Sequence, residues 1–310
     1  MAMTLGPRRG KVFTAAELIA EKGFALHAAE RSARENFDLV YRSLCALMFN
    51  FVPQSGHPGG SISSGRIVQS LLFGTMRYDS GDPEAPKADL ISYAAGHKAL
   101  GLYAMWALRD EVMRAGAPDM VPAALRHRLR LEDLLGFRRN PTNLGPLASE
   151  YSSKALDGHP TPATPFVRLS TGASGVGVAS SFGLALGAKD YWGEDAPRVH
   201  VIEGEGGMTP GRVAEALAAA ATMGLDNIVM HIDWNQASID SNKVCRDGEE
   251  PGDYVQWNPV ELCALNDWNV ILVEDGFDFD EIAAAQRAAV EMNNGQPTAI
   301  VYKTVKGWQY

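Results

Sequence analysis

The stretch from residue 198 to 242 constrains the fold more than any other part of the sequence, because it alternates β-rich and helical runs. Residues 199–202 form a short β-branched run that ends in a glycine-rich turn at 204–207. An alanine-rich run follows at 211–223, and a second β-rich run covers 227–233. This order of strand, turn, helix and strand predicts a parallel unit whose carboxyl edge can bind a ligand.

The rest of the chain repeats this alternation. Further β-rich runs at 88–93, 166–170, 267–274 and 297–304 are separated by helical runs. We therefore predict an α/β fold with a doubly wound, mostly parallel sheet and helices on both faces. Residues 1–50 show apolar residues at helical spacing and no strand pattern, which predicts an N-terminal helical arm before an α/β domain at 51–310.

The charge balance excludes several classes of protein. The net charge of −9 and the pI near 5.3 argue against a nucleic-acid-binding face, which needs a basic surface. The dense basic stretch at 126–130 is predicted to be a solvated helix face. The sequence shows no secretory signal or membrane span. Three cysteines without a CxxC pair indicate neither a disulfide framework nor a zinc site, and we predict a cytoplasmic protein.

Two oxygen-bearing residues close the β-rich runs of the central stretch. Glu205 follows the first run and Asn235 follows the second, so both are expected at one edge of the sheet. Together with a free carbonyl in the loop after Asn235 and the glycine-rich turn at a helix start, they predict a divalent cation bridged to a diphosphate. No turn in the sequence matches the GxGxxG spacing of dinucleotide-binding proteins, and no GK[ST] of a P-loop occurs.

The sequence resembles thiamine diphosphate enzymes, and transketolases in particular. Gly-Glu-Gly at 204–206 is similar to the family's Gly-Asp-Gly motif, and Asn-Gln-Ala-Ser-Ile-Asp at 235–240 is similar to the segment that follows it. Ser-Gly-His-Pro-Gly at 55–59 resembles the transketolase SGHPG signature. Gly-His at 96–97, Gly-His-Pro at 158–160 and the TGxxGxG run at 171–177 resemble three further turns of the family.

The resemblance implies an active site with three histidines. His57, His97 and His159 would hydrogen-bond substrate hydroxyls or shuttle protons, which suits imidazole near neutral pH. The residue pattern alone also allows an exposed turn residue at His57 and a helix cap at His97. His200 and His231 lie inside β-rich runs and are predicted to be structural.

The resemblance also implies thiamine diphosphate as the cofactor, with Mg²⁺ as its cation. The residues implied to contact the cofactor are Gly172, Ser174, Gly175, Gly204, Glu205, Gly206, Asn235 and Ile239. Glu205, Asn235 and the carbonyl of Ala237 are the implied metal ligands. Since Glu205 replaces the family's Asp and is one methylene longer, the site must shift slightly or accept a looser ion such as Ca²⁺.

Two further features depart from the family. Pro210 stands where transketolases carry the Glu that links two active sites across a dimer, which puts that proton link in doubt. The segment between His97 and His159 is longer than the family's, so an insertion is predicted at residues 117–156.

The resemblance predicts the N-terminal half or subunit of a transketolase-like enzyme that transfers a two-carbon ketol unit between sugars or sugar phosphates. The sequence ends at Tyr310, before the family's pyrimidine-binding domain. We therefore expect activity only with a partner subunit that carries this domain, in a heterotetramer or a homodimer-based assembly. Two alternatives remain, the first component of a 2-oxo acid dehydrogenase and a non-catalytic homologue that binds the cofactor or a partner.

Overall fold

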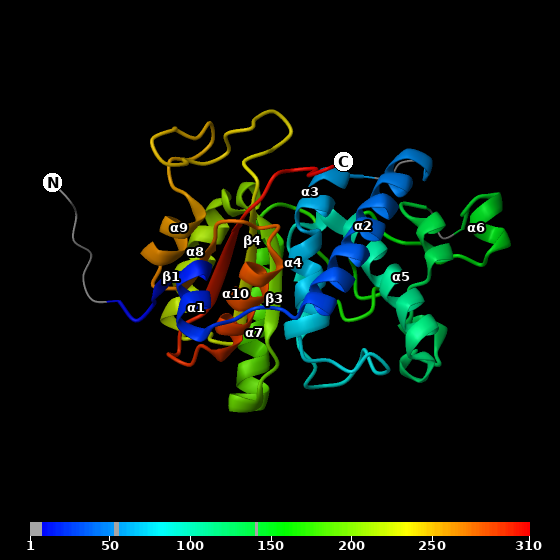
Figure 1. Cartoon of the computed structure of the whole chain (residues 1–310), viewed down its shortest axis with the longest axis horizontal. Coiled ribbons are helices and arrows are strands. Elements are labelled where there is room, and N and C mark those ends of the chain that lie inside the picture. The colour runs from blue at the N-terminus through cyan, green and yellow to red at the C-terminus, as the bar shows by residue number, and fades with distance from the viewer. Residues whose placement is uncertain (1–7, 53–55, 140–141) are drawn as a thin grey trace.

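The structure is a computed structural model that describes residues 8–52, 56–139 and 142–310. Six parallel strands form one sheet in the order β1-β5-β6-β4-β3-β2, which confirms the predicted fold class (Figure 1). The strands are β1 (Val12–Thr14), β2 (Leu90–Tyr93), β3 (Val199–Gly204), β4 (Ile228–Trp234), β5 (Asn269–Val273) and β6 (Thr298–Lys303). Within the described ranges, no helix has the length and apolar character needed to cross a membrane.

Helices cover both faces of the sheet. The α-helices are α1 (Ala15–Lys22), α2 (Ala28–Phe51), α3 (Pro58–Ser63), α4 (Gly65–Ser70), α5 (Ala99–Gly116), α6 (Pro146–Glu150), α7 (Val176–Trp192), α8 (Gly211–Thr222), α9 (Pro259–Leu265) and α10 (Phe279–Glu291). Because side chains alternate along a strand, Val229 packs with α1, α4 and α10 on one face. Its neighbour Ile228 packs with α7, α8 and α9 on the other.

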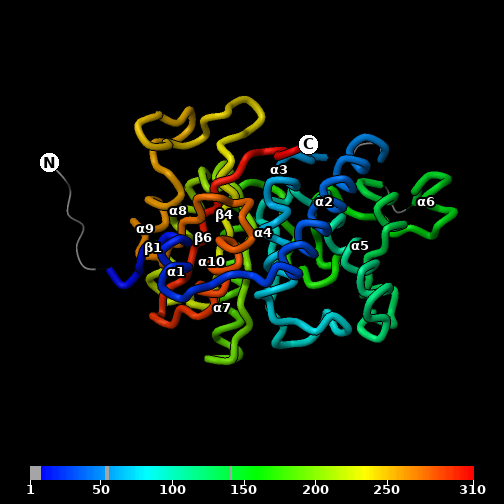
Figure 2. Tube along the Cα trace, viewed as in Figure 1, coloured from blue at the N-terminus to red at the C-terminus, as the bar shows by residue number. Residues whose placement is uncertain are grey.

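The strand register sets the position of the site. β3 pairs with β4 so that Gly204 lies opposite Asp233, and the residues that follow both strands emerge at the same edge of the sheet. The loop after β4 rises above this edge, and the segment after β6 returns along it to α3 (Figure 2). There the N–H of Gly307 donates to the carbonyl of Gly59 over 3.1 Å.

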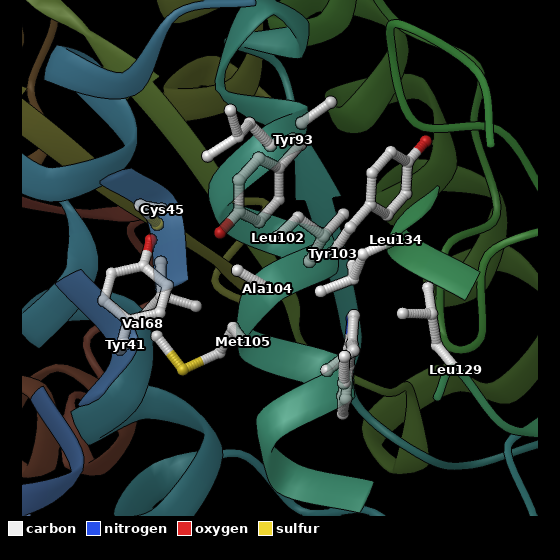
Figure 3. Packing of buried hydrophobic residues seen from close by; sticks show 14 of the residues in the cluster. Tyr41, Cys45, Val68, Tyr93, Leu102, Tyr103, Ala104, Met105, Leu129 and Leu134 are labelled. Atoms are coloured by element: carbon white, nitrogen blue, oxygen red, sulfur yellow. The ribbon is translucent and has the colours of Figure 1, made fainter. Parts of the chain in front are cut away.

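A second part of the core lies beside the sheet, between α2 and α5. Tyr41 and Tyr103 are almost fully buried there (Figure 3). Leu134 and Phe137, from the predicted insertion, are buried in the same cluster. Residues Leu131–Gly136 form a 3₁₀ helix in this segment. This part of the segment therefore belongs to the hydrophobic core.

The prediction that residues 1–50 contain no strand is wrong at β1. These three residues pair in parallel with β5 at the edge of the sheet. The pairing is reinforced just before β1, where the side chain of Asp267 accepts hydrogen bonds from the N–H groups of Arg9 and Gly10 at 2.8 and 3.0 Å. Such a short strand is held by its partners, so its own sequence carries little signal.

One other local prediction is wrong. The run at 166–170 is not a strand, because Phe166 adopts a positive φ of 66° and stacks on Trp106, with ring centroids 4.9 Å apart.

The short helix α3 starts at Pro58, so His57 lies at its N-terminal end. A proline at the first helical position explains this start, because its missing N–H needs no partner there.

The basic stretch at 126–130 is not a solvated helix face. The guanidinium of Arg128 donates to both carboxylate oxygens of the buried Asp110, at 2.8 and 2.6 Å. Arg130 pairs in the same way with the buried Asp133. Arg128 therefore ties this stretch to α5, whereas Arg130 pairs with a residue of the same segment.

Candidate functional site

A cavity of about 410 Å³ lies at the carboxyl edge of the sheet, above β3 and β4. The described residues that line it come from the start of α3, from the segment before α7, from the end of β3, and from the segments after β2, β3, β4 and β6. They are His57, Gly60, Ala94, Ala95, His97, Lys98, Gly172, Ser174, Glu203, Gly204, Glu205, Gly206, Gly207, Asn235, Ala237, Ser238, Ile239, Asp240, Tyr254 and Lys306. Most of the residues predicted from the sequence are therefore brought together in one place.

Glu205 lies at the floor of this cavity, in the 3₁₀ turn Glu205–Met208. Its side chain is 1% exposed, and one carboxylate oxygen accepts a hydrogen bond from the N–H of Asn235 over 3.2 Å. The other oxygen, Oε1, is buried and has no hydrogen-bond partner among the described residues. Burial raises the pKa of Glu205 to about 7, and the charge of Asp233 adds to the shift. The charge of this buried carboxylate is poorly compensated by its surroundings, so a nearby cation would be attracted to it.

Asn235 is held in place by its own side chain. Its Nδ2 donates to Asp233 over 3.0 Å, and its Oδ1 accepts from the N–H of Ala237 over 3.0 Å. Gln236 between them has a positive φ of 61°, which bends the loop back on itself. The carbonyl of Ala237 faces the ammonium of Lys306 at 3.4 Å. The side-chain oxygen of Asn235 and the carbonyl oxygen of Ala237 each keep a lone pair for a further partner.

The donor set fits a divalent cation. No described residues form a group of three or more His, Cys, Asp and Glu side chains that could hold a metal by themselves. The unpartnered Oε1 of Glu205, the amide oxygen of Asn235 and the carbonyl of Ala237 are all hard oxygen donors on the same cavity wall. Mg²⁺ and Ca²⁺ accept such mixed donors and complete their shells with water or phosphate oxygens.

The three predicted histidines lie close together at the cavity. The rings of His57 and His97 meet edge to face, with centroids 5.5 Å apart. The ring of His159 does not line the cavity. It lies behind it, close to the positions that side chains at Gly96 and Gly172 would occupy. A Cβ at Gly96 would lie 3.0 Å from this ring and 2.9 Å from the backbone of Gly172, so glycine permits the close approach.

The surroundings keep two of these histidines neutral. Both rings have surface open to the cavity. The walls of the cavity withdraw His97 from bulk water, which lowers the pKa of its ring. The nearby positive charge of Lys98 lowers this pKa further, to about 3. The pKa of His57 is also lowered, first by desolvation and then by the charges of Arg138 and Lys306. A neutral imidazole both donates and accepts a hydrogen bond.

The remaining predicted cofactor contacts lie at different distances from the cavity. Gly172 and Ser174 line it, whereas Gly175 lies behind them as the residue before α7. Gly175 has a φ of +78°, and a Cβ there would press on Pro210 at 3.0 Å. Ile239 is 95% exposed at the cavity mouth, on the loop after β4.

The sequence reasoning missed several charged residues of the cavity. Glu203 is 1% exposed, and its Oε2 is buried without a partner among the described residues. Burial raises the pKa of Glu203 to about 7, against the lowering effect of the N–H of Gly204. Lys98 is 2% exposed and pairs with Asp233. The spacing of Glu203 and Glu205 around one glycine, and the position of Lys98 directly after Gly96-His97, were the available signals.

Comparisons with known proteins show which family this sequence resembles. Residues 129–309 match the family described as transketolase, thiamine diphosphate binding domain. The chain is 33% identical over 253 residues to transketolase-like protein 2 from Mus musculus, covering 82% of this chain and 34% of that protein. It is 32% identical over 253 residues to transketolase from Homo sapiens, with the same coverage. The chain thus spans about a third of the length of these relatives.

Solved structures of transketolases share the fold of this chain. Transketolase from Leishmania mexicana matches with a TM-score of 0.69 and 25% identity, covering 89% of this chain and 37% of that one. Transketolase from Campylobacter jejuni matches with a TM-score of 0.68 and 25% identity, covering 87% of this chain and 37% of that one. The similarity therefore extends over nearly the whole of this chain in three dimensions.

Proposed function

The chain belongs to the transketolase family, and on this premise we propose that its cavity binds thiamine diphosphate and a divalent cation for two-carbon ketol transfer between sugars or sugar phosphates. The observation that carries the proposal is the buried, unpartnered Oε1 of Glu205 at the floor of the cavity. A buried carboxylate oxygen without a partner is costly, and a bound cation removes that cost.

Glu205, Asn235 and the carbonyl of Ala237 would hold the cation, which in turn would hold the diphosphate. The glycines at 204 and 206 favour this arrangement, because the cavity wall has no side chains there. Mg²⁺ is the expected ion, and Ca²⁺ is the alternative because the longer Glu205 allows a wider coordination shell. When bound, thiamine diphosphate supplies the nucleophilic carbon that ketol transfer requires.

The histidines would orient the sugar. His57 and His97 border the same cavity, and their lowered pKa values keep both rings neutral near pH 7. In this form each ring can accept a hydrogen bond from a substrate hydroxyl and donate a hydrogen bond to another oxygen. The ring of His159 lies close to Gly96 and Gly172, and from there it would hydrogen-bond a substrate hydroxyl.

We infer that the complete active site includes polypeptide beyond residues 1–310. The curated relatives are about three times as long as the matched part, because it covers 34% of each. The exposed Ile239 and the half-exposed Tyr254 stand at the cavity mouth, where a further chain or domain would cover them. A pyrimidine-binding subunit of a transketolase-like enzyme fits this position, in a heterotetramer or a homodimer-based assembly.

Calorimetric titration of the purified protein with thiamine diphosphate and Mg²⁺ tests the proposal. We expect saturable binding of thiamine diphosphate and much weaker binding of thiamine, which lacks the diphosphate. Ketol transfer from a ketose to an aldose is then assayed after addition of candidate pyrimidine-binding subunits. Equal affinity for thiamine and thiamine diphosphate would contradict the diphosphate site. Cofactor binding without ketol transfer in any assembly would instead favour a non-catalytic homologue.

A further inference from the structure

A buried lysine lies at the wall of the cavity. The side chain of Lys98 is 2% exposed, and its ammonium donates to Oδ2 of Asp233 over 2.7 Å. An ammonium has three N–H donors. In the part of the chain that the structure describes, Asp233 is the one hydrogen-bond acceptor of this ammonium. Two of its donors therefore remain for another group.

Asp233 is well supplied with donors apart from Lys98. It accepts from Ser63 over 2.6 Å and from Asn235 over 3.0 Å, and it also accepts from Thr304. The carboxylate is therefore a fixed anion that holds the ammonium in one position.

Two glycines leave this ammonium next to the cavity. A Cβ at Gly204 would lie 3.8 Å from Nζ of Lys98, and a Cβ at Gly60 would lie 3.2 Å from its Cε. Gly204, Gly60 and Lys98 all line the same cavity. A side chain at Gly204 would stand between the ammonium and the glycine-rich turn, so the absence of one keeps this approach open.

We propose that Lys98 binds the diphosphate of the cavity's ligand directly, with Asp233 holding the ammonium in place. This inference rests on the proposed function, because it assigns the ligand's anionic end to the turn at Gly204. It gives the diphosphate a second cation besides the metal. It follows that part of the diphosphate affinity survives without a divalent ion and depends on Lys98.

The alternative is that Lys98 only neutralises Asp233. The double variant Lys98→Met/Asp233→Asn separates the two roles, because it removes both charges together and leaves no unpaired buried ion. The matched control is Lys189→Met/Asp226→Asn, which removes an ion pair of 2.6 Å far from the cavity, at the start of β4. Lys98→Arg keeps the charge. Thermal unfolding of each variant verifies that it folds.

Inorganic pyrophosphate and thiamine diphosphate are titrated by calorimetry, each with excess chelator and with Mg²⁺. In chelator, we expect the double variant to bind pyrophosphate about tenfold more weakly than the wild type or more, since a hydrogen bond to a charged group is lost. The control pair should bind as the wild type does, and Lys98→Arg should retain part of the affinity.

The outcomes distinguish this inference from the proposed function. If the folded double variant binds pyrophosphate in chelator as tightly as the wild type, Lys98 is a structural counter-ion and the inference is overturned. The proposed function still stands in that case, provided that the wild type binds thiamine diphosphate with Mg²⁺. If the wild type does not bind thiamine diphosphate under any condition, the proposed function itself fails.

Discussion

The carboxylate of Glu205 accepts a hydrogen bond from the backbone N–H of Asn235 over 3.2 Å, and this contact joins the ends of the two central strands. One oxygen of Glu205 thus fixes the loop after β4, and the other remains free at the cavity floor. The carboxylate therefore has a structural contact and a separate binding position, which a single substitution can separate.

Replacing Glu205 by Gln tests its role as a metal ligand. Gln keeps an oxygen for the N–H of Asn235 but loses the negative charge, so the fold should persist while metal-dependent cofactor affinity falls by about tenfold or more. Calorimetry with thiamine diphosphate in Mg²⁺ and in chelator measures this difference. Glu215→Gln, on the exposed side of α8, is the matched control. If the affinity for thiamine diphosphate in Mg²⁺ were unchanged in both Glu205→Gln and Glu205→Ala, Glu205 would not be a metal ligand.

Glu203 makes the stability of the ligand-free protein depend on pH. Its pKa is raised from 4.5 to about 7, so between these values the folded state binds more protons than the unfolded state. Stability therefore falls as pH rises through this range. Glu203→Gln should remove this loss, with a gain on the order of 3 kcal/mol near pH 8 and little change near pH 5.

Urea unfolding of the wild type and Glu203→Gln in chelator, at about pH 5 and about pH 8, measures this effect. The comparison between the two pH values serves as the control, because an effect of the amide on packing alone would change the stability similarly at both. A Glu203→Gln protein that is less stable than the wild type near pH 8 would show that the ionised carboxylate has a partner in solution.

Asp133 joins two parts of the predicted insertion to each other. It is fully buried and accepts hydrogen bonds from the guanidinium of Arg130 and from the N–H of Lys154, at 2.8 and 3.0 Å. Replacing Asp133 by Ala should cost about 3 kcal/mol, because Arg130 loses its buried partner. Asp119→Ala, exposed in the same segment, should change little. Urea unfolding at neutral pH measures both, and equal effects would show that the segment does not depend on this anchor.

The same residue should make the protein sensitive to acid. Burial would raise the pKa of Asp133, but the hydrogen bonds from Arg130 and the backbone outweigh it and lower the pKa below its usual 3.8. Its contribution is therefore complete above about pH 4 and is lost as pH falls through the folded pKa. The variant at Asp133 should lack this part of the acid transition.

Much of the architecture could be predicted because it depends on local patterns. β3, β4 and α8 follow from β-branched and alanine-rich runs separated by glycines, and those runs dictate their own structure. β1 could not be predicted, since three residues at a sheet edge are held by β5 and by Asp267. Phe166 was misread because its apolar neighbours resemble a strand, whereas aromatic stacking decides its backbone.

The residues of the site fall into the same two groups, those that a local sequence pattern predicts and those that it does not. His57, Glu205 and Asn235 are embedded in motifs whose order indicates a function, and they line one cavity as expected. Lys98 and Glu203 carry no motif, and a charged residue in a sequence is more often a surface residue than a buried one. Only the packing of the turn at Gly204 against Lys98 reveals that the cavity wall is charged.

Two neighbouring glycines in the turn after β3 offer a last test, because their surroundings differ. A Cβ at Gly206 would meet nothing within 4 Å, on the cavity wall, whereas a Cβ at Gly207 would lie 2.3 Å from the carboxylate of Glu203. Gly206→Ala should therefore leave the melting temperature nearly unchanged and weaken thiamine diphosphate binding, since its methyl group projects into open space where the ligand is proposed to lie. Gly207→Ala must displace a buried carboxylate and should cost about 2 kcal/mol of stability.

Thermal unfolding and calorimetry on the same two proteins separate the effects. Combining Gly207→Ala with Glu203→Ala should restore part of the lost stability, because the displaced carboxylate is gone. If Gly206→Ala bound thiamine diphosphate as the wild type does, the diphosphate would not approach this turn, and the cation at Glu205 would have to hold it from another side of the cavity.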